Sequence, residues 1–216
     1  MEDTQSVNIE IPETLSDVKL SAYKQFILAA DEENGDELAL DYFCGLTPAM
    51  QEGMKKKDLD FVRNHIAKVL SEKPVLRKNF TYKGKEYGFH PKLEDISMGE
   101  YVDLDEYLKD PYRNAEKFLG ILYRPITKKM FGRHDIENYN PDVHNGQGFQ
   151  DLSADIFLGC LLFFYRIATN LQLTFLQSLE KQEKKDMTYN LNLAESGVGM
   201  EQYINLLKEI SLSLKQ

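Results

Sequence analysis

The stretch Ile156-Phe157-Leu158-Gly159-Cys160-Leu161-Leu162-Phe163-Phe164-Tyr165 is the most apolar part of the chain. It is ten residues long and is followed by Arg166, whereas a membrane-spanning helix needs about 20 apolar residues. Ser153 is a suitable N-cap for a helix that begins here, and apolar residues continue at steps of three and four. We therefore predict that residues 153–182 form a long central helix, the most buried one in the fold.

Shorter helices are predicted on the N-terminal side of this segment. Apolar residues recur there every three or four positions, as on one face of an α-helix. The predicted helices cover residues 17–33, 37–43, 57–72, 96–108 and 114–122. One alternating stretch, Val7–Pro12, instead predicts a short strand that ends at the proline.

A β-hairpin is predicted within residues 79–90. Two runs of alternating aromatic residues flank Lys83-Gly84, which fits a two-residue hairpin loop and places Phe80 opposite Tyr87. Side chains two positions apart share a face of a strand, so four aromatic residues gather on one side. They are Phe80, Tyr82, Tyr87 and Phe89.

The rest of the chain completes the predicted organisation. Residues 127–151 are rich in Asn, Gly, Pro and His and are predicted to form a long irregular loop. We predict one domain over 1–182, a polar linker over 183–198 and an amphipathic helix over 199–216. The predicted fold class is mainly α (α+β), a helical domain with a small hairpin, a long central buried helix and a C-terminal helix on a linker.

The C-terminal helix is the first candidate partner-binding element, because a short helix beyond a polar linker needs a surface to pack on. Its apolar residues are Met200, Tyr203, Ile204, Leu207, Ile210 and Leu214. Whether it packs on its own domain or on a partner is left open by the sequence. Tyr123 and Arg124 form a second candidate surface. The alternative is an ordinary helix end, in which Arg124 meets the last carbonyls and Pro125 stops the helix.

A short pattern recurs three times. Asp17-Val18-Lys19-Leu20 resembles Asp95-Ile96-Ser97-Met98 and, more loosely, Asp155-Ile156-Phe157-Leu158. We interpret it as a common helix-start signal, with an acidic residue before an apolar first turn. The alternative is that similar approaches to a helix pack in similar pockets.

Composition excludes several classes of function. The formal net charge is −9, which disfavours binding to nucleic acid because phosphates require a positive field. Two cysteines among apolar neighbours indicate neither a disulfide framework nor a zinc site. The polar, acidic start Met1–Gln5 differs from a signal peptide. We therefore expect a protein of the reducing cytosol with no membrane segment.

The sequence shows no recognisable catalytic apparatus. Phosphate-binding loops, nucleophile elbows and kinase signatures are missing. His134 and His144 lie in the predicted loop near Glu137, but their spacing matches no metal-site template. We expect no cofactor and no metal, and we interpret the chain as a non-enzyme that binds other proteins.

Several segments together resemble a family of virion proteins from tailed bacteriophages, including crAss-like and marine phages. They occur in the same order as in that family and span nearly the whole chain. The segments are Ile11–Val18 with Tyr23, Phe80–Ile96, Gly99–Leu104, Leu122–Ile126, Leu158–Tyr165 and Gly197–Met200.

The resemblance implies a non-enzymatic role in phage morphogenesis, with other phage structural proteins as partners. A tail-assembly chaperone or other assembly factor is the first expectation. The alternatives are a minor structural protein at a head–tail or tail ring, and an accessory phage protein that binds a host factor. The expected location is the host cytoplasm during assembly, or the virion, and a homo-oligomer is compatible with each role.

Overall fold

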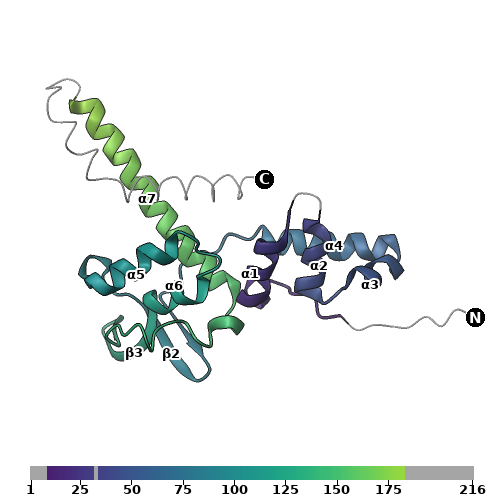
Figure 1. Ribbon diagram of the computed structural model, residues 1–216, viewed down its shortest axis with the longest axis horizontal. Helices are drawn as coiled ribbons and strands as arrows, with labels where there is room; N and C mark the ends of the chain where they lie inside the picture. The colour runs from purple at the N-terminus through teal and green to yellow at the C-terminus, as the bar shows by residue number, and fades with distance from the viewer. Residues whose placement is uncertain (1–8, 32–33, 183–216) are drawn as a thin grey trace, which may run out of the picture.

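The computed structural model describes residues 9–31 and 34–182 of the chain. Within them, seven α-helices and a four-stranded antiparallel sheet form a mixed α+β fold, about 54% helical and 14% strand. The α+β class is confirmed, but the fold is only partly the mainly helical one expected, because the sheet is larger than a single hairpin. Figure 1 shows the N-terminal helices on one side, the sheet with two further helices on the other, and the last helix starting between them.

The N-terminal side consists of four helices. They are α1 (Leu20–Ala29), α2 (Gly35–Cys44), α3 (Pro48–Gly53) and α4 (Lys56–Leu70). Their shared core includes Leu40, Leu46, Val62 and Ile66. Helices α1, α2 and α4 confirm three predicted helices to within a few residues, whereas α3 is too short for a periodic pattern and begins at Pro48, a favoured first position.

The strand expected over Val7–Pro12 is not formed in its described part, Ile9–Pro12. Ile9 and Ile11 instead pack against the core of α2–α4. The alternating apolar residues Ile9 and Ile11 therefore contact helices in the described part of the chain, and they do not form a strand there.

The sheet has the strand order β1-β2-β3-β4, and each neighbouring pair is antiparallel. The strands are β1 (Asn79–Tyr82), β2 (Lys85–Phe89), β3 (Tyr123–Met130) and β4 (Arg133–Ile136). The first two confirm the predicted hairpin, with Phe80 opposite Tyr87. The expectation of an irregular loop from residue 127 is wrong over its first part, since β3 and β4 form a second hairpin there.

The four aromatic residues of the first hairpin pack as expected. Phe80 stacks on Tyr87 at 5.6 Å between ring centroids, and both rings contact Phe149. Tyr82 also meets Phe149, and Phe89 meets Tyr123. These rings join the sheet to the segment before the last helix.

Helix α7 (Ala154–Gln182) is central only in its first turns. Ile156, Phe157, Cys160 and Leu161 are buried in the main core. In Figure 1 the rest of α7 extends away from the fold. The predicted helix is confirmed, and its predicted burial holds for the N-terminal part. Within the described residues, no helix has the length and apolar content needed to cross a membrane.

The recurring sequence pattern corresponds to a recurring helix start. A 3₁₀ turn precedes α1, α5 (Met98–Leu108) and α7 by two residues in each case. The third copy expected from the sequence, Asp155–Leu158, lies inside α7, and the residues that follow the 3₁₀ turn there are Leu152 and Ser153. The segments before α1 and α7 pair with each other, because the Leu20 amide donates to the Leu152 carbonyl and the Ala154 amide donates to the Val18 carbonyl, at 2.7 and 2.8 Å.

Candidate functional site

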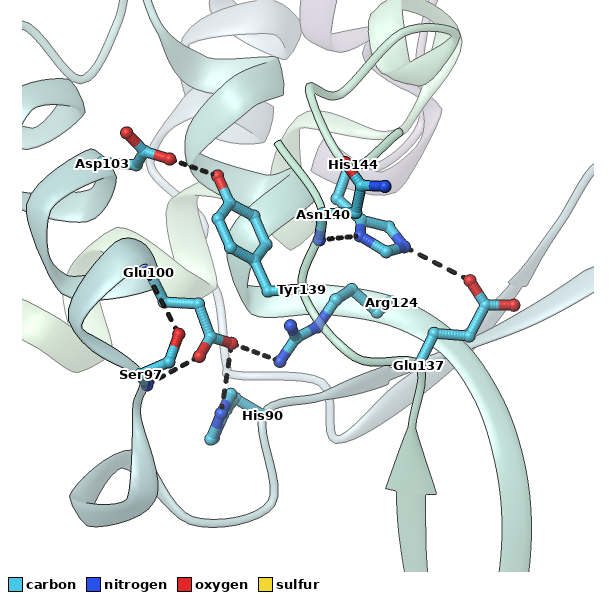
Figure 2. A network of polar contacts seen from close by, with 9 residues as sticks. All are labelled: His90, Ser97, Glu100, Asp103, Arg124, Glu137, Tyr139, Asn140 and His144. Carbon is cyan, nitrogen blue, oxygen red and sulfur yellow. Dashed lines mark hydrogen bonds and ion pairs between the residues drawn. The ribbon is translucent and has the colours of Figure 1, made fainter. Parts of the chain in front are cut away.

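Buried charged side chains gather where β2 ends, α5 begins and α6 (Ala115–Leu122) passes into β3. Glu100, Arg124 and His90 are each less than one tenth exposed. Figure 2 shows them beside Tyr139 and His144, which come from the segment after β4. A group of buried charges in a small fold is a candidate site, because ionised groups are costly to bury unless they serve each other or a function.

Glu100 is fixed by the start of its own helix. Its carboxylate accepts a hydrogen bond of 2.7 Å from the Ser97 amide, and the Ser97 hydroxyl accepts one of 3.3 Å from the Glu100 amide. This is a capping box, which satisfies two free amides of the first turn. Burial works against the charge, but the Ser97 hydrogen bonds and the Arg124 charge outweigh it, so the pKa of Glu100 lies below its ordinary value.

Arg124 is the partner of Glu100. Its Nη2 atom lies 2.6 Å from Glu100 Oε1, and its guanidinium lies 5.7 Å from the centre of the Tyr139 ring. The Tyr139 hydroxyl in turn donates to Asp103 at 2.6 Å. The pair therefore joins α5, β3 and the segment after β4.

The structure corrects the prediction that Tyr123 and Arg124 form a partner-binding surface. Tyr123 is 1% exposed and donates its hydroxyl proton to the Arg77 carbonyl, while Arg124 is 3% exposed. The alternative of a helix end is right in its position, because α6 ends at Leu122. The contacts differ, because the next residue already belongs to β3 and Arg124 pairs with Glu100. The other predicted partner-binding residues, 200–214, lie outside the described part of the chain.

His90 lies on the other side of Glu100, with its Nε2 atom 3.6 Å from Glu100 Oε1. This carboxylate favours the imidazolium, but burial and the Arg124 charge oppose it, and the pKa of His90 lies below its ordinary value. His90 is therefore neutral at pH 7, and Glu100 is balanced by Arg124 alone.

The segment after β4 closes the site. The His144 ring accepts a hydrogen bond from the Asn140 amide at 3.0 Å and lies 3.2 Å from the Glu137 carboxylate. His144 is buried, which differs from the solvated loop expected from the sequence. Among the described residues, no group of three or more His, Cys, Asp or Glu side chains is placed to hold a metal ion.

This arrangement favours a structural role. The charges of Glu100 and Arg124 are directed at each other, and burial raises the pKa of the Cys160 thiol, which keeps it protonated and unreactive. Sequence reasoning missed the pair because Glu100 and Arg124 are far apart along the chain and charged residues usually indicate surface. The Ser-x-x-Glu motif at 97–100 was the available signal for the position of Glu100.

Acidification is expected to destabilise the fold through His90. Because its pKa is lower in the folded chain than in the unfolded one, the unfolded state binds more protons once the pH falls below about 6.5. The free energy of unfolding should decrease from pH 7.5 to 5.5. The decrease should be smaller in His90→Gln than in wild type, measured by urea unfolding. The control is His65→Gln, a half-buried histidine in α4, and an unchanged pH dependence in His90→Gln would contradict the assignment.

Two exposed surfaces stand out from this buried site. The first, the hairpin tip, comprises residues 127–133, which are the end of β3, the turn and the first residue of β4, and Phe131 there is 97% exposed. The second, the α5 face, comprises Met98, Tyr101, Val102 and Asp105 on the outer side of α5. The first three of these side chains are more than half exposed. Sequence reasoning singled out neither surface.

Comparisons with protein-family models, with curated proteins and with solved structures found no match for this chain.

Proposed function

We propose that this chain is a non-enzymatic phage morphogenesis protein, a tail-assembly chaperone or other assembly factor that acts by binding other proteins. The phage context rests on the resemblance of its sequence segments. The observation that supports protein binding is the exposure of large apolar side chains on two ordered surfaces. Grouped apolar residues on a protein surface commonly mark sites of interaction.

The hairpin tip is the more informative of the two surfaces. Phe131 has φ of 51°, a left-handed backbone conformation that bulky residues rarely adopt, and Gly132 follows with φ of 75°. Asn, Asp or Gly would fit the first position of such a turn better. Phe131 strains the backbone, and because its ring is almost fully exposed it contributes little packing energy to the folded chain. Contact with another molecule is therefore the better explanation for a phenylalanine at this position.

Quantitative mass spectrometry of purified particles and of infected-cell lysate tests this role. An assembly factor is expected to be abundant in lysate and absent from particles. A phage carrying Phe131→Asp should then form fewer complete tails in electron micrographs. A fixed number of copies per particle would favour the minor structural protein. Normal particles from a phage that lacks the gene would contradict a role in assembly and favour the accessory protein.

A further inference from the structure

The hairpin tip and the α5 face are opposite in charge. Lys128, Lys129 and Arg133 surround Met130 and Phe131 at the tip, and residues 127–133 contain no acidic side chain. Residues 92–110, which include α5, contain seven acidic and two basic side chains. Each surface thus combines apolar side chains with charge of a single predominant sign.

Some of these charges are already used within the chain. Lys129 pairs with Glu86 in β2, Asp95 with Lys92, and Glu106 with Lys109. Within the described residues, Lys128 and Arg133 at the tip form no ion pair, and neither do Glu94 and Asp105 beside the α5 face. These four charges therefore remain available to a partner.

We infer that the chain associates with a second copy of itself, in a contact that places the hairpin tip of one copy on the α5 face of the other. Phe131 and Met130 would cover Met98, Tyr101 and Val102, while Lys128 and Arg133 approach Glu94 and Asp105. We choose a second copy as the partner because of charge complementarity. The basic, apolar tip requires an acidic, apolar surface, and the α5 face of this chain is such a surface.

The shape of the two surfaces agrees with this contact. The tip is a narrow two-stranded projection whose end carries the aromatic ring, beside an open hollow of about 260 Å³ lined by Asn79 and residues 129–134. The α5 face is the outer side of a regular helix whose inner side holds Glu100 and Leu104 in the fold. In Figure 1, α5 and β3 lie at the same end of the molecule, away from α2–α4. Because the two surfaces differ, the contact forms twice in a reciprocal pair of copies or repeats head to tail, in a ring or an open filament.

Self-association does not rest on the phage role, and it is measured on the purified full chain. Sedimentation velocity over a range of concentrations should give a mass above the 25.0 kDa of one chain. The association should weaken at high salt, because exposed charges are screened. A single chain at every concentration in low salt would overturn the inference.

The Phe131→Gly variant separates binding from folding. Glycine relieves the left-handed backbone at this position, so the variant should unfold at the same temperature as wild type or higher. It should nevertheless associate at least tenfold more weakly, because the apolar ring is lost. Unchanged association in this variant would overturn the contact.

Charge reversal tests which surfaces meet. Lys128→Glu with Arg133→Glu, or Glu94→Lys with Asp105→Lys, should each weaken association, and the two pairs combined in one chain should restore it. The matched control is Lys55→Glu with Lys57→Glu, a reversal of two exposed lysines at the start of α4. Failure of the combined variant to recover, or an equal loss in the control, would overturn the pairing of tip and α5 face.

Discussion

Replacement of Arg124 by Met is expected to reduce the free energy of unfolding by about 3–5 kcal/mol, the usual effect of removing one partner from a buried ion pair. Met keeps an unbranched apolar side chain but removes the guanidinium, so Glu100 remains 4% exposed and loses the cation that pairs with its carboxylate. The Ser97 hydrogen bonds still favour its ionised form, while burial, the largest influence on its pKa, opposes that form without the Arg124 charge to offset it. Urea unfolding measures this loss. We expect a lower midpoint concentration of urea and an unchanged dependence of the free energy of unfolding on urea concentration.

The double variant Glu100→Met with Arg124→Met is the control for this effect. If the cost of Arg124→Met is that of an unpaired buried charge, removal of both charges should cost less than the sum of the two single replacements. Glu100→Met also loses the capping box, so the double variant is not expected to reach wild-type stability. Additive effects would show that the two charges act independently and that the pair does not hold the site together.

The elements predicted correctly are those whose signal lies within a few residues. Helix α4 follows from apolar steps of three and four, and the hairpin of β1 and β2 follows from Lys83-Gly84 between aromatic runs. In that hairpin Lys83 and Gly84 both have positive φ, as the turn type requires. Such patterns predict local structure because the spacing of the apolar side chains matches the repeat of the helix or strand that they form.

The second hairpin was missed for a physical reason. Strand β3 begins directly after α6, contains Pro125, and carries exposed Thr127, Lys128 and Lys129 in its second half. Proline and lysine are depleted in strands, and the tertiary pairing with β2 and β4 overrides that local preference. The sequence predicts a surface position for Arg124 for the same reason, because its contact with Glu100 depends on pairing across distant parts of the chain.

The segment after β4 depends most on such distant contacts, as its glycines show. A Cβ atom at Gly146 would lie 1.9 Å from the Glu116 carbonyl oxygen, and one at Gly120 would lie 2.4 Å from the His144 carbonyl oxygen. Because Gly120 and Gly146 have no side chains, this segment can lie directly on α6. In Figure 2 the same segment holds Tyr139 over Arg124 and His144 beside Glu137. The composition that suggested an irregular loop therefore reflects close packing.

Gly146→Ala is accordingly expected to destabilise the fold by about 2–5 kcal/mol, from the left-handed backbone and the overlap with Glu116 together. Gly132→Ala is its control, because Gly132 has the same φ of 75° and no atom within 4 Å of an added Cβ. It should cost only about 1–2 kcal/mol. The difference between the two variants, measured by urea unfolding, isolates the contact with α6. Hydrogen exchange in Gly146→Ala should rise over residues 137–148, since lifting the segment admits water to Arg124. Equal costs in the two variants would contradict close packing here, and the buried charges would then depend on α5 and β3 alone.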